Sequence, residues 1–396
     1  MCDLRDVFIV GAARTPIGNF LGSMKNFTAT DLGGFAIEEA VSRAGITGDD
    51  VDEVIMGNVV SAGVGQAPAK QALIKGGIPP TVNSFAVNKV CGSALKAVDL
   101  AAQAIWLGER EIVVAGGMES MSQAPRLLWG VRDGIKMGDI TMKDAMIHDG
   151  LWCAFDGQHM GLTGEVIAEK FGATREEQDA YAVSSHQKAV HALENGYFKE
   201  EVFPIEIPQR KGDPIVFAAD EGPRADANVE KLSRLRPVFK KDGTVTAGNA
   251  SSLNDGGAAV VVASADAVKE KGLTPLARIL GTATNALEPE MVMYAPKGAV
   301  EKLLAKVGWK TEDVDLFELN EAFSSQLVVL LKEMGLDREK VNVHGGAVAL
   351  GHPIGATGAR ILTTLIYALK HRGLKKGIAG LCLGGGDAIA MAVEIV

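Results

Sequence analysis

The stretch Val87-Asn88-Lys89-Val90-Cys91-Gly92-Ser93-Ala94-Leu95-Lys96-Ala97-Val98 decides how the rest of this 396-residue chain is interpreted. A short apolar segment, 85–90, leads through Cys91 into a helical pattern at 93–106. The thiol is therefore predicted at the first turn of a helix, where free N–H groups and the helix dipole favour thiolate over thiol. A catalytic nucleophile and an inert buried cysteine agree equally well with this stretch taken alone.

The helix predicted at 93–106 is apolar on almost every side. Lys96, Asp99 and Gln103 form its only polar stripe. Such a helix is expected to be packed inside the protein. A reactive group at its beginning would be held rigidly.

The composition indicates a compact α/β protein. Hydrophobic residues make up 47% of the chain, charged residues 22%, and there are 47 glycines, which fits many tight turns. The length predicts two or three domains or subdomains. The net charge of −9 argues against nucleic acid or an anionic membrane surface as the main partner.

The cysteine pattern indicates a reducing compartment. The four cysteines include no C-x-x-C pair, which fits neither a disulfide scaffold nor a zinc site; they are Cys2, Cys91, Cys153 and Cys382. The first residues show no signal or transit pattern, and no apolar run is long enough to span a bilayer. We therefore expect a cytoplasmic protein, with no metal or redox cofactor.

Strand and helix patterns alternate near the beginning of the chain and again near its end. The first set comprises strands at 7–13, 54–60, 85–90 and 112–115, with helices at 30–44 and 93–106. The second set comprises strands at 258–263, 276–280, 314–319, 341–343, 378–383 and 388–396, with a helix at 359–370. Two similar halves predict a pseudo-twofold layered α/β core with a site between them, at the carboxyl ends of strands.

The domain organisation follows from this repeat. Residues 1–120 with 247–272 are expected to form the first half and 273–396 the second, with 121–246 inserted as a large loop domain. Inside the insertion, a capping box at Thr174 predicts a helix that runs to about 195. The segment 209–241 carries eight basic and five acidic residues in an otherwise acidic chain, which fits a phosphate ligand, or a solvated loop of mixed charge.

Three further motifs carry groups suited to catalysis. His352 lies in the glycine-rich stretch 345–358 and is a candidate base for Cys91, or a loop histidine with one structural hydrogen bond. Cys382 precedes three glycines whose N–H groups suit an oxyanion, although core packing would also explain it. Asn320, in Asn-Glu-Ala-Phe, follows a predicted strand and is either a site residue or a turn or helix cap.

Together these motifs resemble those of the thiolase family, over essentially the whole chain. Cys91 in Val-Cys-Gly-Ser matches the acylated nucleophile, and Cys382 in Cys-Leu-Gly-Gly-Gly matches the second, acid/base cysteine. His352 in Gly-His-Pro-Ile-Gly matches the histidine that activates the nucleophile, and Asn320 matches the asparagine that holds a catalytic water. Four motifs in the right order are specific. The resemblance implies the thiolase fold, a layered αβαβα core with a loop insertion.

The resemblance also implies a reaction. It is the reversible Claisen condensation of two acetyl-CoA to acetoacetyl-CoA and CoA through an acyl-cysteine, with coenzyme A and acyl-CoA as substrates and no tightly bound cofactor. Two oxyanion holes are implied: His352 with a water on Asn320, and the backbone N–H groups of Cys91 and Gly384. The alternatives are a 3-ketoacyl-CoA thiolase for longer or unusual chains, a non-catalytic acyl-CoA-binding relative, and a ketoacyl-carrier-protein synthase, whose Cys-His-His pattern disagrees with Cys382.

Substrate contacts and assembly are implied as well. The positions that match the family's coenzyme A contacts are Leu151, His159, Met160, Arg224, Ser251, Ala322 and Phe323. The pair His159-Met160 resembles biosynthetic, acetoacetyl-CoA-type members. The chain departs from the short-chain pattern Met-Gly-Thr-Gly-Pro at 292–296, where Met293 and Tyr294 are bulkier, and more mildly at Ser252 and His344. A homodimer that pairs into a tetramer through the loop 125–138 is also implied; Leu127, Leu128 and Trp129 would then be buried in a partner, or else packed on their own subunit.

Overall fold

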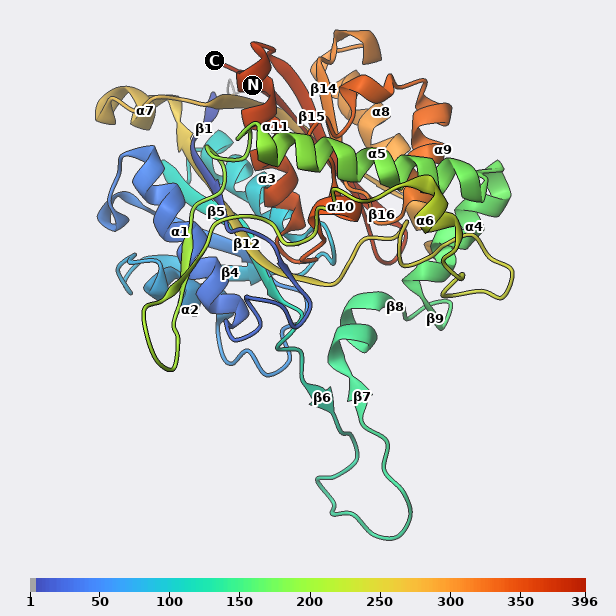
Figure 1. Ribbon diagram of the computed structural model, residues 1–396. Coiled ribbons are helices and arrows are strands. Elements are labelled where there is room, and N and C mark those ends of the chain that lie inside the picture. The colour runs from blue at the N-terminus through green and yellow to red at the C-terminus, as the bar shows by residue number, and fades with distance from the viewer. Residues whose placement is uncertain (1–4) are drawn as a thin grey trace.

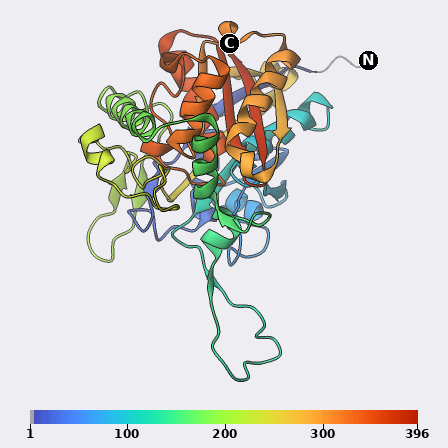
Figure 2. The same ribbon diagram turned by 90° about the vertical axis from the view of Figure 1, so that its right-hand side faces the viewer.

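The computed structural model describes residues 5–396, so that Cys2 lies outside the described residues. Within this range no helix has the length and apolar character needed to cross a membrane. Figures 1 and 2 show a layered body from which one long hairpin loop projects.

A ten-stranded mixed sheet forms the frame of the molecule. In spatial order its strands are β14 (Leu316–Leu319), β15 (Lys376–Leu383), β16 (Asp387–Ile395), β13 (Ala277–Ala286), β1 (Val7–Arg14), β12 (Asn254–Ser264), β5 (Ile112–Ser120), β3 (Glu53–Gly57) and β4 (Asn83–Val87), with β2 (Gly18–Asn19) paired to β12. The continuous apolar runs of these strands suit a sheet that is covered on both faces.

The two halves of the sheet repeat the same pairing. β1 pairs antiparallel with β12, β12 antiparallel with β5, and β5 parallel with β3; β13, β16, β15 and β14 repeat this order. The register shifts between Ile9 and Gly11 in β1 and between Ile279 and Gly281 in β13, which are equivalent places. The predicted pair of repeated halves is confirmed.

Helices form three layers around the two halves (Figure 1). α1 (Ala29–Ala44) and α2 (Pro68–Lys75) cover the first half, and α8 (Ala295–Val307) and α9 (Ser324–Met334) cover the second. α3 (Ser93–Trp106) and α11 (Thr357–Arg372) pack against each other in the middle layer. Leu95, Val98 and Ile361 belong to the buried cluster there. The two halves of the sheet, joined by the short pairing of β1 with β13, act as two layers, so the order helix, sheet, helix, sheet, helix is the predicted αβαβα core.

The insertion is built from short elements and one long helix. These are β6 (Arg126–Leu127), β7 (Lys143–Asp144), the π-helix η2 (Met146–Leu151), β8 (Trp152–Cys153), β9 (Gln158–His159), α4 (Met160–Phe171), α5 (Arg175–Glu194), β10 (Ile205–Ile207), β11 (Ile215–Phe217) and α6 (Val229–Ser233). Thr174 caps α5 through the predicted capping box. The hairpin β6–β7 carries the loop that projects from the body in both views.

The remaining elements are short. They are η1 (Gly48–Asp50), α7 (Ala265–Lys271), η3 (Pro289–Tyr294), η4 (Thr311–Asp313), η5 (Arg338–Lys340) and α10 (Ala347–Leu350). Of these, η3 and α10 lead into the candidate site described below.

The strand predicted at 341–343 is wrong, because this segment forms only single bridges, such as Phe317 with Val341. Asn342 has a φ of 47°, which is left-handed and cannot continue a strand. Its side chain takes the place of the backbone hydrogen bonds of a strand: the amide oxygen accepts from Leu319 N and the amide nitrogen donates to Leu319 O, both at 2.8 Å. Two other predicted strands end early, at Gly57 and Val87, which leaves 58–60 and 88–90 as loops beside the site.

Candidate active site

Cys91 lies on a strained turn between β4 and α3. Val90 has a φ of 47°, an unusual value for a β-branched residue. The turn is held by Val90 N, which donates to Asn88 Oδ1 at 3.0 Å, and by Ser93 Oγ, which donates to Val90 O at 2.6 Å. α3 spans the predicted residues, so the thiol is presented just ahead of the helix.

The predicted effect of the helix start on the pKa of this thiol is outweighed by burial. Burial raises the pKa of Cys91 to about 11, although the N–H groups of Gly384 and of Cys91 itself lower it. The negative charge of Glu119 raises this pKa further. Cys91 is therefore a protonated thiol at neutral pH and needs a base before it can attack.

Cys382 is a buried thiol at the carboxyl end of β15. Burial raises its pKa to about 12, the neighbouring Cys91 raises it further, and the Gln326 side chain lowers it. The sulfur of Met293 lies 3.8 Å from its Sγ. The two candidate thiols, one from each half of the fold, are therefore close enough for Cys91 to affect the titration of Cys382.

His352 is held as a neutral imidazole with a defined tautomer. Thr357 Oγ1 donates to Pro353 O at 2.9 Å, so it accepts from His352 Nδ1 at 2.7 Å. This assigns the ring proton to Nδ1 and leaves the lone pair on Nε2. Burial lowers the pKa of His352 to about 3, with a further contribution from Arg360. The backbone N–H is anchored to Asn254 Oδ1 at 2.8 Å.

Asn320 follows β14 and faces the histidine. Its Nδ2 lies 3.5 Å from His352 Nε2. Its Oδ1 is buried and has no hydrogen-bond partner among residues 5–396. A buried carbonyl without a partner is costly, so the amide is suited to hold a water or a substrate group.

Gly384 brings a backbone N–H to the nucleophile. A Cβ at this position would lie 3.2 Å from a methyl carbon of Val90 and 3.7 Å from the sulfur of Met160, so a larger residue would press on the site. Gly385 and Gly386 follow with φ of 94° and 95°, which only glycine adopts readily. Gly384 thus brings its N–H to Cys91 at the start of a turn that continues through Gly385 and Gly386.

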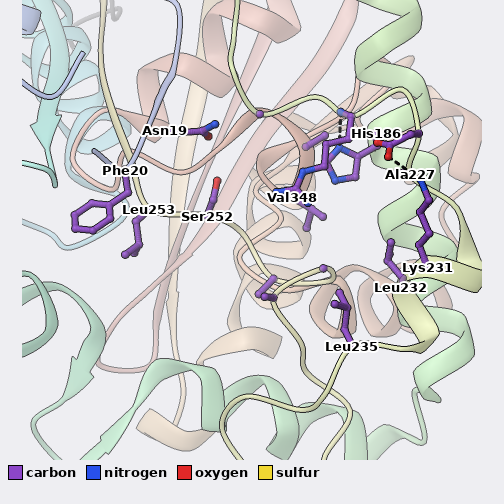
Figure 3. A pocket seen from close by; sticks show the side chains of 17 residues that line it. Asn19, Phe20, His186, Ala227, Lys231, Leu232, Leu235, Ser252, Leu253 and Val348 are labelled. Atoms are coloured by element: carbon purple, nitrogen blue, oxygen red, sulfur yellow. Dashed lines mark hydrogen bonds and ion pairs between the residues drawn. The ribbon is translucent and has the colours of Figure 1, made fainter. Parts of the chain in front are cut away.

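A cavity of about 400 Å³ lies beside this centre (Figure 3). Phe20, Ser252 and Leu253 lie on one side of it, and His186 and Lys231 on the other. Arg224 also lines it, whereas Cys91, His352, Asn320 and Cys382 do not. Val348 and Ala349 line the cavity a few residues before His352, so it adjoins the reactive groups without containing them.

The other predicted contact residues lie around the cavity or nearer the thiols. Ser251 lies between two lining residues and donates its N–H to Ala322 O at 3.0 Å. His159 stacks on Phe239, with ring centroids 4.7 Å apart, and Phe239 packs edge-on against Phe323. Two further residues lie near Cys91. Leu151 packs on the hydrophobic cluster that Cys91 also contacts, and Met160 lies near Gly384.

The basic segment 209–241 is partly neutralised by its own acids. Lys231 pairs with Asp226 at 2.6 Å and Arg234 with Glu230 at 2.5 Å. Its Arg224 and Lys231 line the cavity, so the predicted phosphate contact stays a prediction for these two side chains.

Three residues of the site were missed in the sequence. Asn254 holds the backbone of His352, Thr357 sets its tautomer, and Glu119 accepts hydrogen bonds from the loops on both sides. Glu119 had a visible signal, a carboxylate within an apolar strand pattern. Asn254 contacts His352 from a distant strand, and Thr357 contacts it from the start of α11. Neither contact leaves a recognisable pattern in the sequence.

Known proteins resemble the chain along its whole length. The model of the thiolase N-terminal domain matches residues 7–266, and that of the thiolase C-terminal domain matches 273–395. An acetyl-CoA acetyltransferase of Allochromatium vinosum is 52% identical over 389 residues, 98% of this chain and 99% of the relative. The acetyl-CoA acetyltransferase structure of Bacillus anthracis has a TM-score of 0.95 at 45% identity, with both chains fully covered. Human mitochondrial 3-ketoacyl-CoA thiolase has a TM-score of 0.96 at 42% identity, also with full coverage.

Proposed function

The chain belongs to the thiolase family of acyltransferases, and we propose that it is an acetyl-CoA C-acetyltransferase that joins two acetyl-CoA reversibly into acetoacetyl-CoA and CoA. The proposal assigns the chemistry to Cys91, Cys382, His352 and Asn320. The observation that supports it is a pair of neighbourhoods. Cys91 is close enough to Cys382 to affect its titration, and the neutral His352 lies 3.5 Å from Asn320, whose amide oxygen has no partner among residues 5–396.

In the first step Cys91 takes the acetyl group. His352 Nε2 accepts the thiol proton, and the sulfur attacks the thioester carbonyl. The Cys382 thiol gives its proton to the departing coenzyme A, which leaves as the thiol, and Cys382 is left as the thiolate. The backbone N–H groups of Cys91 and Gly384 face this sulfur and suit the oxygen of the tetrahedral intermediate. Exchange of one thioester for another costs little energy, so the acetyl group is stored without loss of reactivity.

In the second step Cys382 acts as the base. Its thiolate removes a proton from the methyl group of a second acetyl-CoA, and the carbanion attacks the acetyl group on Cys91. The bond between that acetyl group and the Cys91 sulfur breaks, and the sulfur takes back the proton held on His352. The enolate oxygen would be held by His352, protonated at Nε2 after the first step, and by a water on Asn320. The Oδ1 of Asn320, which has no partner in the described part of the chain, supports this role.

A trapping experiment tests the reaction. Mixing the enzyme with acetyl-CoA should release one CoA per active site in a burst and leave an acetyl group on Cys91, detected by peptide mass spectrometry. In a separate assay, the enzyme should cleave acetoacetyl-CoA with free CoA at a steady rate. Absence of both acetyl-enzyme and thiolysis would leave only the binding-protein alternative.

The side chains at 293 and 294 bear on acyl-chain length. Met293 is buried with its sulfur against Cys382, so it borders the space that an acyl chain would enter. Tyr294 instead stacks on Phe171 and donates to Glu333 at 2.9 Å, which holds it at the outer surface between α4 and α9. Because the Met293 side chain narrows the space beside Cys382, we favour acetyl groups as the substrate over longer acyl chains.

Coenzyme A is proposed to lie along the insertion, 121–246, and the Ser251 loop. Arg224 and Lys231 in the cavity suit its phosphates, whereas His159, Met160 and Leu151 lie toward the thiols, where the pantetheine must end. Leu151 and Phe323 supply apolar surface for that arm. Reduced cytoplasm suits a mechanism that needs two free thiols.

The projecting loop supports a homo-oligomer, proposed as a dimer of dimers. Trp129 is 53% exposed, Ile135 61% and Met137 100%, an unusual set of apolar side chains for a surface loop. Burial between subunits would explain them. Replacing 128–142 by a short glycine-serine linker should reduce the mass measured by light scattering from tetramer to dimer.

A further inference from the structure

Glu119 is a fully buried carboxylate at the carboxyl end of β5, and the proposed reaction does not yet use it. Its Oε1 accepts from Asn58 Nδ2 at 2.9 Å and from Val60 N at 3.2 Å. Its Oε2 accepts from Val59 N at 3.1 Å and from Gly355 N at 2.9 Å. Four hydrogen bonds to one buried carboxylate clamp these loops firmly, because hydrogen bonds to a charged group are strong where water is excluded.

The clamp joins the two segments that carry the nucleophile and the base. The loop 58–60 is bonded to the chain leading to Cys91, since Asn58 N donates to Val87 O at 3.1 Å. Cys91 itself packs on the cluster that contains Val59 and Val60. The other segment begins at His352 and reaches Glu119 through Gly355.

Gly355 allows this contact at very short range. A Cβ there would lie 2.6 Å from Glu119 Oε2 and 2.7 Å from Met118 O. The loop after His352 is therefore seated directly on β5. Any other residue at 355 would push the loop away from the carboxylate.

The charge of Glu119 is coupled to the nucleophile. Burial raises the pKa of Glu119 to about 7, against the backbone N–H groups of Val59, Val60 and Gly355, and the nearby Asp255 on β12 raises it further. The same carboxylate raises the pKa of Cys91. Asp255 and Cys91 are the titratable groups that interact with it from the neighbouring elements.

We propose that Glu119 is a positioning residue for acyl transfer: its carboxylate locks the loop of His352 to the segment of Cys91, so that base and nucleophile meet at a fixed separation. The proposal rests on the proposed thiolase function. The residue touches neither substrate nor reacting atoms and acts through the two loops.

The test uses Glu119→Gln, which keeps the shape but presents an NH₂ group where two donors need an oxygen. Displacement of the loop should slow acetylation of Cys91 by about 100-fold, a typical effect of small misplacement, with little change in KM. Removal of the charge should also shift the pH profile of Cys91 alkylation, followed by peptide mass spectrometry, to lower pH. A purely structural role would not lower the alkylation midpoint.

Glu165→Gln is the matched control, because Glu165 is also buried and clamps Thr244 N and Val245 N at 2.8 Å in the insertion. It should lower the melting temperature without moving the alkylation midpoint. If Glu119→Gln does not fold, Gly355→Ala separates the loop from an intact carboxylate and should also slow acetylation.

The outcomes separate the two proposals. If the unmodified enzyme is not acetylated by acetyl-CoA, the proposed function fails. If it is acetylated, and a folded Glu119→Gln or Gly355→Ala variant is acetylated equally fast, the positioning role is overturned. A midpoint of Cys91 alkylation that does not move in Glu119→Gln would also overturn it.

Discussion

The imidazole nitrogen Nε2 of His352 lies 3.5 Å from the amide nitrogen of Asn320, from which it is separated by 32 residues. Thr357 and Asn254 hold the ring and the backbone of His352, so the relationship is rigid on the histidine side. Oδ1 of Asn320 accepts no hydrogen bond from residues 5–396 and is therefore able to accept one here. A proton acceptor and an amide that can bind a further group are thus placed together before any substrate arrives.

Asn320→Ala should lower kcat for condensation by about 10²–10³-fold, because one oxyanion donor is lost at the transition state. KM for acetyl-CoA should change little, since the amide is proposed to act on the enolate and not on the ground state. Steady-state kinetics measures both. Asn195→Ala, at the exposed end of α5, should leave kcat unchanged; a similar loss of kcat in both variants would contradict the assignment.

Cys91→Ala and Cys382→Ser should separate the two half-reactions. Cys91→Ala should give no acetyl-enzyme, whereas Cys382→Ser should release the CoA burst but fail to condense. The reason is that coenzyme A can also leave as a thiolate, whereas the methyl proton of the second substrate is removed by Cys382. Rapid-quench mass spectrometry follows the acetyl group, and condensation at the normal rate in either variant would refute the roles.

Met293→Ala should move the optimum in a series of 3-ketoacyl-CoA substrates toward longer chains. The shorter side chain removes the thioether that lies 3.8 Å from Cys382 Sγ. Initial thiolysis rates with acetoacetyl-CoA and its longer homologues measure the shift. Tyr294→Phe is the matched control and should leave the series unchanged; a shift with Tyr294→Phe alone would place the acyl pocket elsewhere.

His344→Asn should change the dependence of stability on pH. Burial lowers the pKa of His344 from 6.5 to about 3, so below pH 6.5 the unfolded chain binds a proton that the folded chain does not. The contribution of the neutral His344 ring to the free energy of unfolding is fully present above pH 6.5 and is lost as the pH falls toward 3. Lowering the pH to 5 should therefore reduce the advantage of the unmodified protein over the variant by about 2 kcal/mol.

Thermal unfolding of both proteins at pH 7.5 and pH 5 measures this difference. The melting temperatures should converge at the lower pH. A gap that stays constant would show that His344 does not titrate in this range. The stacking of its ring on Tyr197, with centroids 5.1 Å apart, is lost at both pH values and so does not affect the comparison.

Local patterns in the sequence determined the repeated α/β halves, the helix limits and the reactive residue types. α3 begins and ends at the predicted residues, and Thr174 caps α5 as predicted, because apolar periodicity and caps depend on residues within a few positions. The motifs around Cys91, His352, Asn320 and Cys382 likewise lie in short stretches, which made the family resemblance visible.

Only the tertiary structure decided the electrostatics and the supports of the site. Burial raises the pKa of Cys91, against the effect expected from its helix, because the loss of water outweighs a nearby dipole. Met293 faces Cys382 while its neighbour Tyr294 turns to Phe171, which adjacent positions in a sequence cannot reveal. Glu119 acquires its hydrogen-bond partners from one loop 59 to 61 residues away and another 236 residues away, so its role exists only once both halves are packed together.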